Sequence, residues 1–208
     1  MKSCGYNSEE IKVFRKLSTP AKVQDFLNSL PFNFERKGET CMSPSEVLRA
    51  GKAHCVEGAI LAAAILEFHG AKPLILDLRS THKPFDFDHV VAVFEVDGYY
   101  GALSKTNHSV LRYREPIYKT LRELALSYFH EYFLDDGRKT LREYSDLLDL
   151  NKFNKQNWRT SKDNLFEIPE YLDRIKHYKI LNTKQVRNLR LADKVEIKAG
   201  EIVEYSNE

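Results

Sequence analysis

Two side chains of this sequence could together perform acyl chemistry, and they are Cys55 and His89. A cysteine thiolate can attack a carbonyl carbon, and a nearby imidazole can move the protons that the reaction requires. A third polar group commonly orients the imidazole. A cysteine followed 34 residues later by a histidine therefore predicts a thiol-dependent acyl-transfer site, provided that the fold brings the two side chains together.

Cys55 stands at the start of a segment whose composition predicts a buried helix. Residues 55–69 are rich in alanine, leucine and isoleucine, contain no proline, and carry apolar side chains on every side. Gly70 suits the left-handed position that ends a helix, and Pro73 prevents any continuation. Unpaired N–H groups and the helix dipole at the N-terminal end favour a thiolate over a thiol. The alternative is that Cys55 is an inert buried thiol, as most free cysteines are.

His89 begins the segment with the strongest strand composition in the chain, residues 89–96. The dipeptide Asp97-Gly98 is typical of a two-residue type I′ turn, so residues 99–104 should return as the partner strand. This turn fixes the register of the hairpin, and the register makes Ser104 a diagonal neighbour of His89 on the same face. We therefore expect Ser104 to lie beside the imidazole of His89.

Four runs of the sequence resemble the transglutaminase-like branch of the papain-like cysteine fold. They are Ser43–Leu48, His54–Ala59, Leu74–Leu78 and Asp88–Phe94. The resemblance covers roughly residues 43–110 and looks closest to bacterial members that have no assigned reaction. It implies an α+β fold in which a buried, cysteine-bearing helix packs on an antiparallel sheet with surrounding helices. It also implies a thioester on Cys55, with His89 as general base and then general acid.

The third position of the site departs from the pattern of this family. In the family an aspartate ends the strand that follows the histidine strand, whereas the matching residue here is Ser104, which carries no charge. Asn107 could take the role of the asparagine in papain-like triads if a bulge turned it inward. Asp88 is a further carboxylate close to His89 in sequence, although an extended strand would turn it away. Ser104 and Asn107 therefore both remain candidates to orient the imidazole.

Four further residues are candidates for contact with a substrate. His54 adjoins the nucleophile, and Glu57 stands two positions after it, as an acid does around the nucleophile of arylamine N-acetyltransferases. Tyr100 could line an acyl-donor cleft, and Asp88 belongs to the same substrate-facing group. Each also has a structural interpretation, because acids in a first helical turn are stabilised by the dipole and most aromatic residues lie in cores. Gly58 is expected to allow close packing of a neighbouring element.

Composition and charge argue against several other classes of function. The chain of 208 residues has a net charge of only +2, with acids and bases mixed, which argues against nucleic acid as a partner. No run approaches membrane-spanning length and the N-terminus lacks a signal peptide, so we expect no membrane partner and a cytoplasmic location. The three cysteines are scattered, with no CxxC pair and no calcium-type loop, so we expect free thiols, no metal and no cofactor. The sequence leaves the oligomeric state open.

The chain divides into an expected domain over residues 1–150 and a more polar C-terminal extension over residues 151–208 that packs on it. Helices are expected at residues 8–17, 20–30 and 44–50, and a further strand at 73–78. The spacing of apolar residues predicts a long amphipathic helix over residues 115–133. A small terminal hairpin is predicted near residues 195–204.

The sequence therefore predicts cysteine-dependent hydrolysis or acyl transfer on an amide or peptide substrate. Whether water or an amine accepts the acyl group stays open. Because Ser104 replaces the expected carboxylate, the alternative is a catalytically impaired fold of the same kind that binds a peptide or protein in the inherited cleft. A purely structural domain is a third interpretation, and it predicts no cleft at the Cys55 end of the helix.

Overall fold

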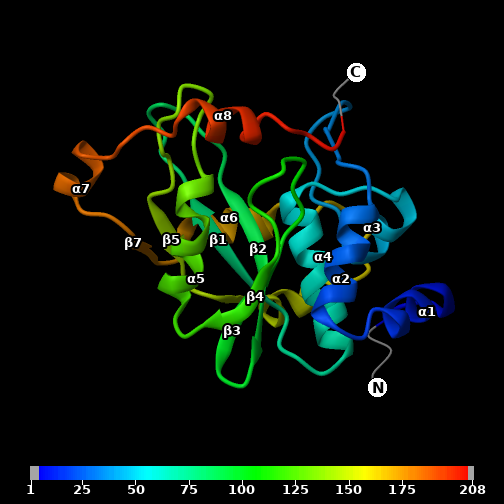
Figure 1. The fold of residues 1–208 in the computed structure, drawn as a ribbon. Coiled ribbons are helices and arrows are strands. Elements are labelled where there is room, and N and C mark those ends of the chain that lie inside the picture. Colours follow the sequence, from blue (N-terminus) through cyan, green and yellow to red (C-terminus); the bar gives the residue numbers. More distant parts are fainter. Residues whose placement is uncertain (1–4, 206–208) are drawn as a thin grey trace.

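The computed structural model describes residues 5–205 and shows an α+β fold with one antiparallel sheet (Figure 1). The strands follow one another in the order β4-β3-β2-β1-β5-β7, and β6 pairs with β1 outside this path. The strands are β1 (Leu74–Arg79), β2 (His89–Val96), β3 (Tyr99–Leu103), β4 (Arg114–Tyr118), β5 (Glu143–Ser145), β6 (Leu148–Asp149) and β7 (His177–Lys179). The helices are α1 (Ser8–Lys16), α2 (Pro20–Ser29), α3 (Pro44–Ala50), α4 (Cys55–Phe68), α5 (Leu121–Tyr128), α6 (Glu167–Arg174), α7 (Thr183–Arg187) and α8 (Lys194–Gly200), with 3₁₀ helices at Phe129–Glu131 and Leu150–Gln156.

Two hydrophobic cores lie on the two faces of this sheet. Residues of β2 alternate between them, because Val90 and Ala92 join the first core whereas Val91 and Val93 join the second. Helices α1 to α4 contribute to the first core, and α4 packs against β1 and β2. Helix α5 covers the other face. The sheet therefore carries the cysteine-bearing helix on one of its two covered faces.

Helix α4 begins at Cys55, as the sequence predicts. Every residue from Glu57 to Leu66 is buried, and Gly70 has the left-handed φ of 98° that suits a helix C-terminus. A Cβ atom at Gly58 would lie 2.4 Å from Cβ of Lys105. The glycine therefore lets α4 approach the segment after β3, and the expected close packing at Gly58 is confirmed.

The hairpin of β2 and β3 has the predicted register. Val96 pairs with Tyr99 across the turn, and Asp97 and Gly98 have positive φ values of 51° and 80°. Two positive φ values are what a type I′ turn requires. The register carries Ser104, the residue just after β3, to the start of β2.

The prediction of a long helix over residues 115–133 is wrong. Arg114–Tyr118 instead forms β4, which pairs with β3 at one end of the sheet. Pro116 is tolerated there because an edge strand does not need every N–H for pairing. Helix α5 starts only after Thr120, whose hydroxyl accepts from a backbone N–H of the first turn. The apolar residues on the two sides of Thr120 therefore serve two different elements.

The prediction of a terminal hairpin near residues 195–204 is also wrong, because this region contains α8. The Asp193 carboxylate accepts from two N–H groups of the first helical turn, and Glu196 accepts from the Asp193 N–H at 2.8 Å. This capping box selects the helix. The branched residues Val195 and Ile197, which suggested a strand, therefore lie on a short helix.

The segment after residue 150 returns to the core. Trp158 is fully buried, and Leu165, Ile168 and Leu172 join the hydrophobic cluster around α4. Strand β7 extends the sheet beyond β5. This segment therefore packs on the same body as the residues that precede it.

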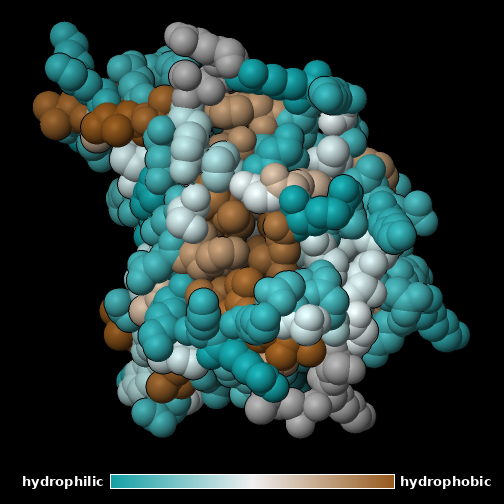
Figure 2. Space-filling model, turned by 90° about the vertical axis from the view of Figure 1, so that its right-hand side faces the viewer, coloured by the Kyte–Doolittle hydropathy of each residue, from teal (hydrophilic) through white to brown (hydrophobic). Residues whose placement is uncertain are grey.

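Across residues 5–205 no helix has both the length and the apolar character needed to cross a membrane. Figure 2 shows that the face at the right of Figure 1 carries hydrophilic side chains around a central hydrophobic area. Large apolar side chains are also exposed on the loop between β1 and β2, at Phe85 and Phe87.

Candidate active site

Cys55 is the first residue of α4 and is partly exposed, whereas Cys41 is buried. Burial would raise the pKa of the Cys55 thiol, but hydrogen bonds with His54 and His89 and the charges of both imidazoles outweigh it and lower the pKa to about 5. Burial raises the pKa of Cys41 well above its usual range. Cys4 lies outside the described residues. Of the two described cysteines, only Cys55 has surroundings that favour a thiolate, and the structure brings it together with His89.

The far nitrogen of His89 is held by Ser104. His89 Nε2 lies 2.7 Å from Ser104 Oγ, and both residues are buried. Ser104 Oγ donates its own hydrogen to the carbonyl oxygen of Leu111 at 2.5 Å, so it accepts from His89 Nε2–H. With Nε2 occupied, Nδ1 is the nitrogen left for the Cys55 thiol. The serine therefore lies where the third member of a triad would lie.

The backbone of Ser104 is fixed by Gln24 of α2, a residue that the sequence analysis missed. Gln24 Nε2 donates to Ser104 O at 2.8 Å, and Ser104 N donates to Gln24 Oε1 at 2.9 Å. Gln24 is only 5% exposed. A glutamine on the apolar side of a helix, next to Val23 and Leu27, is the signal that could have identified it.

Glu57 is fully buried and accepts four hydrogen bonds at the start of α4. Oε1 accepts from Thr40 Oγ1 at 2.8 Å and Met42 N at 3.0 Å, and Oε2 accepts from Asn33 Nδ2 at 3.1 Å and His54 N at 3.0 Å. These bonds tie the first turn of the helix to the loop before α3. The structure therefore places Glu57 in the interior, where its carboxylate is committed to the backbone and to neighbouring side chains.

His54 is the N-cap residue of α4 and contacts the nucleophile. Its Nε2 lies 3.0 Å from Thr40 O, 3.5 Å from Glu57 Oε1 and 3.8 Å from Glu35 Oε1. Burial lowers the pKa of His54. The hydrogen bond with Cys55, the charges of Cys55 and Glu57 and the Thr40 carbonyl together outweigh burial and raise the pKa to about 9. His54 therefore belongs to the immediate surroundings of the thiol.

The structure does not bring Asn107 to the imidazole. Asn107 Nδ2 donates to Tyr205 O at 2.9 Å, and Tyr205 N donates to Asn107 Oδ1 at 2.9 Å. Both ends of this amide are therefore committed to the C-terminal segment. Of the two candidates for the third position, Ser104 contacts His89 and Asn107 does not.

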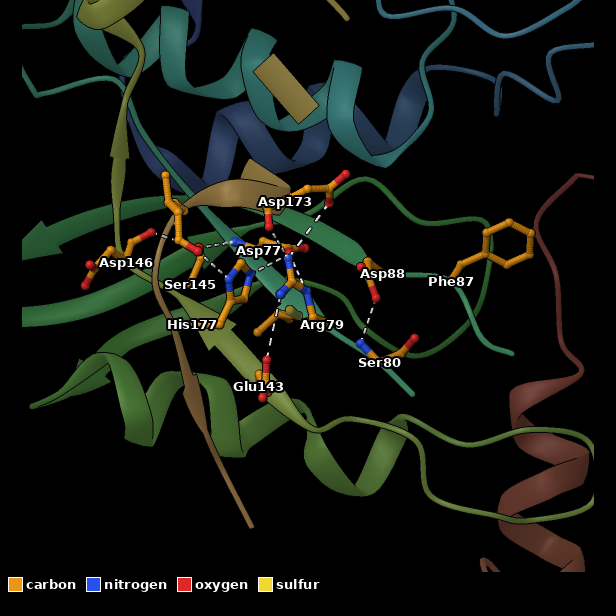
Figure 3. Close-up of polar contacts among 12 residues, drawn as sticks. Asp77, Arg79, Ser80, Phe87, Asp88, Glu143, Ser145, Asp146, Asp173 and His177 are labelled. Carbon is orange, nitrogen blue, oxygen red and sulfur yellow. Dashed lines mark hydrogen bonds and ion pairs between the residues drawn. The ribbon is translucent and has the colours of Figure 1, made fainter. Parts of the chain in front are cut away.

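Two other candidates have structural partners. Asp88 Oδ1 accepts from Ser80 N at 2.7 Å, and Figure 3 shows this bond across the loop between β1 and β2. Tyr100 pairs with Glu95 near the turn of the hairpin, at the end of β3 away from Ser104, and packs against the second core. The structure therefore does not bring Tyr100 to the thiol, and it commits the Asp88 carboxylate to a loop.

Figure 3 also shows a buried carboxylate–imidazole pair between β1 and β7. His177 Nε2 lies 3.0 Å from Asp77 Oδ2, and His177 Nδ1 lies 2.9 Å from the carbonyl oxygen of Ile175. Burial raises the pKa of Asp77, although the hydrogen bond from His177 opposes this effect. The backbone N–H of Asp77 donates to Ser145 Oγ at 2.9 Å. These partners make the pair a part of the packing between the two strands.

A cleft of about 450 Å³ lies beside the turn that carries His54. Thr40, which bonds His54, lines this cleft together with the aromatic residues Phe32 and Phe34 and with cationic residues such as Lys52. Its size suits a small molecule or part of a peptide. Within residues 5–205, no group of three His, Cys, Asp or Glu side chains is arranged to hold a metal ion.

The sequence profile of a family described as a transglutaminase-like domain matches residues 5–122, which is more than half of the chain. The matched range contains Cys55, His89 and Ser104. A comparison with curated proteins finds no match.

Proposed function

Because the chain belongs to the transglutaminase-like domain family, we propose that it performs cysteine-dependent acyl chemistry through a thioester on Cys55. The substrate is an amide or peptide, and the acyl group passes to water or to an amine. The observation that carries this proposal is the 2.7 Å hydrogen bond between His89 and Ser104, which lies beside a thiol whose pKa the neighbouring His54 and His89 lower to about 5. The proposal includes a papain-like arrangement of the cysteine helix and a cytoplasmic location.

In the first half-reaction the Cys55 thiolate attacks the carbonyl carbon and forms the C–S bond. Backbone N–H groups at the start of α4, including that of Cys55, stabilise the oxyanion. Protonated His89 then gives the Nδ1 proton to the leaving nitrogen as the C–N bond breaks and the amine departs. The products are a free amine and an acyl thioester.

In the second half-reaction water or an amine attacks the thioester carbonyl. His89 Nδ1 takes the proton of the attacking group, the C–S bond breaks, and the Cys55 thiolate is restored. Ser104 holds Nε2 in both steps, so that Nδ1 stays directed towards the reacting atoms. The same imidazole therefore serves as acid and then as base.

Ser104 also supports a second candidate function, because a hydroxyl adds no charge to stabilise an imidazolium. In serine proteases, replacing the triad carboxylate with a neutral amide lowers kcat about 10⁴-fold. A chain with this defect could bind a peptide or protein in the cleft beside Thr40 without turning it over. This binding module is the alternative that an acylation experiment must separate from the enzyme.

Incubation of the full chain with p-nitrophenyl acetate separates the two, because this ester acylates a reactive thiolate without a proton for its leaving group. We expect an acetyl group on Cys55 and none on Cys41, detected by peptide mass spectrometry, followed by its hydrolysis. The variant His89→Gln should retain the acetyl group, with hydrolysis slowed about 10²–10⁴-fold through loss of the general base. The variant Cys55→Ala should release p-nitrophenol no faster than background.

Two results would favour the binding module instead. The first is a Cys55 that acquires no acetyl group while the chain is folded. The second is a thioester that the wild-type chain hydrolyses no faster than His89→Gln.

A further inference from the structure

The imidazole of His54 has two neighbours that can accept a hydrogen from it, the carbonyl oxygen of Thr40 and the thiolate of Cys55. Nε2 lies 3.0 Å from the carbonyl oxygen of Thr40, which can only accept, so Nε2 carries a hydrogen. The ring also interacts with the adjacent Cys55, which raises the pKa of His54 while His54 lowers the pKa of the thiol, and with Nε2 occupied the nitrogen available for this interaction is Nδ1. A thiolate can only accept as well, so beside a thiolate Nδ1 also carries a hydrogen. A histidine that donates from both nitrogens is an imidazolium.

Two carboxylates lie close to the ring of His54. Glu57 Oε1 and Glu35 Oε1 lie 3.5 Å and 3.8 Å from His54 Nε2, and the Glu57 side chain is fully buried. In the part of the chain that the structure describes, His89 forms no ion pair with a carboxylate, and its Nε2 meets the neutral hydroxyl of Ser104. The two carboxylates therefore favour a positive charge on His54.

We propose that His54 is a second cationic partner of the Cys55 thiolate, which keeps the thiolate ionised independently of His89. The role of this ion pair in catalysis rests on the proposed function, whereas the ion pair itself does not. The two imidazoles then have different tasks, since His89 transfers protons and His54 holds the charge opposite the sulfur. In the family pattern a carboxylate stabilises the histidine that transfers protons. In this chain the carboxylates of Glu57 and Glu35 lie beside His54 instead.

The ionisation of Cys55 can be titrated on the full chain from the rate of iodoacetamide alkylation at each pH, followed on the Cys55 peptide. The variants are His89→Gln, His54→Gln and the double variant, since glutamine removes the charge of His54 and can keep a hydrogen bond to Thr40. In His89→Gln we expect the titration midpoint to stay at least about two units below the ordinary value of 9.0. In His54→Gln the midpoint should rise by at least about one unit, which lowers alkylation below the midpoint about tenfold. The double variant should titrate within about one unit of 9.0.

Two alkylation results would overturn the proposal. The midpoint could reach the ordinary value in His89→Gln alone, or stay unchanged in His54→Gln. Alkylation needs no acyl substrate, so these results stand apart from the p-nitrophenyl acetate experiment. A chain whose His54→Gln midpoint rises but which never acetylates Cys55 refutes only the proposed function, whereas an acetylated chain with an unchanged midpoint refutes only this inference.

Nitrogen-15 spectra of the imidazoles provide a measurement that does not depend on folding of a His54 variant. In the wild-type chain at pH 7 we expect both nitrogens of His54 to carry hydrogens. In Cys55→Ala the fraction of His54 in this charged state should fall, because the thiolate is gone. A neutral His54 ring in the wild-type chain at pH 7 would contradict the proposal even if every variant folded.

Discussion

The imidazole of His89 and the hydroxyl of Ser104 form a 2.7 Å hydrogen bond whose direction is fixed, because Ser104 Oγ donates to the carbonyl oxygen of Leu111. The side chain of Gln24 bonds both the backbone N–H and the backbone carbonyl of Ser104. The orientation of the imidazole therefore depends on the backbone after β3 and not on a carboxylate. A neutral acceptor is enough to decide which nitrogen turns towards Cys55.

The variant Ser104→Ala should slow hydrolysis of the acetyl group from Cys55 by at least about tenfold, because the His89 ring loses the partner that orients it as a general base. The substitution leaves the buried Nε2–H group of His89 and the half-buried carbonyl oxygen of Leu111 without their partner. We expect the free energy of unfolding to fall by about 1–3 kcal/mol. Peptide mass spectrometry and urea unfolding measure the two effects.

Ser145→Ala is the matched control for Ser104→Ala. Ser145 is also fully buried, and its hydroxyl accepts from Asp77 N at 2.9 Å and donates to Asp146 O at 2.8 Å. It forms no hydrogen bond with His89. This control should lose stability to a similar degree and hydrolyse the thioester at the wild-type rate. Equal hydrolysis rates in both variants would show that Ser104 does not orient the imidazole.

The pairing of Cys55 with His54 makes folding stability depend on pH. The pKa of Cys55 is lowered from 9.0 to about 5, so its contribution is complete above pH 9 and is lost as the pH falls towards 5. The pKa of His54 is raised from 6.5 to about 9, so its contribution is complete below pH 6.5 and is lost as the pH rises through 9. Between pH 5 and 6.5 the unfolded chain binds one proton more at these two groups than the folded chain. Stability should therefore rise over this interval and then level off up to pH 9.

Urea unfolding of the wild-type chain and of Cys55→Ala at pH 5, 6.5 and 8 tests this dependence. The two proteins share every other titrating group, so the difference in unfolding free energy reports the Cys55 thiol and its coupling to the neighbouring imidazoles. The wild-type chain should gain stability relative to Cys55→Ala from pH 5 to 6.5, because over this interval the thiol is protonated only in the unfolded wild-type chain. A difference that is the same at pH 5 and 6.5 would mean that the thiol is protonated in the folded chain throughout.

The sequence predicted best where a local pattern decides the structure. Composition placed the start of the buried helix at Cys55, and the dipeptide Asp97-Gly98 fixed the register that sets Ser104 beside His89. Over residues 115–133 the local pattern was ambiguous. Only the position of β4 at one end of the sheet makes a proline acceptable there, and that position is a property of the whole sheet.

Long-range polar partners could not be predicted from local patterns. Gln24 bonds Ser104 across 80 residues, and Tyr205 takes the side chain of Asn107 across 98. Each partner choice depends on which segments the fold brings together. The proximity of Asn107 to the histidine strand in sequence therefore does not predict its partner, because the backbone of the C-terminal segment binds its side chain instead.

The variant Gly58→Ala should destabilise the chain, although alanine normally favours a helix over glycine by about 1 kcal/mol. The added Cβ would lie 2.4 Å from Cβ and 3.1 Å from Cγ of Lys105. A Cβ atom cannot rotate away, so α4 or the segment after β3 must shift. Lys105 is buried and its Nζ donates to Leu30 O at 2.5 Å, which restrains that shift. Overpacking of this kind costs about 1–3 kcal/mol, and urea unfolding that shows a gain in stability would contradict it.

The variant Glu57→Gln should lower stability far more than its near-identical shape suggests. Thr40 Oγ1 and Met42 N donate to one carboxylate oxygen, and Asn33 Nδ2 and His54 N donate to the other. An amide presents only one oxygen, so in either orientation the backbone N–H of Met42 or that of His54 faces an NH₂ group. A donor left without an acceptor in this way costs about 1–3 kcal/mol, and the free energy of unfolding should fall by at least that amount.

Glu10→Gln is the matched control for this last variant, because Glu10 occupies the same position in the first turn of α1 and accepts the N-cap N–H of Asn7 at 2.7 Å. That contact is exposed and has a single donor, which an amide oxygen can equally accept. Its unfolding free energy should therefore stay within about 0.5 kcal/mol of wild type. Urea unfolding of both variants at pH 7 compares the Glu57 carboxylate, which accepts four hydrogen bonds, with the Glu10 carboxylate, which accepts one from the N-cap. Equal losses would mean that the four bonds to Glu57 do not hold the turn on which Cys55 stands.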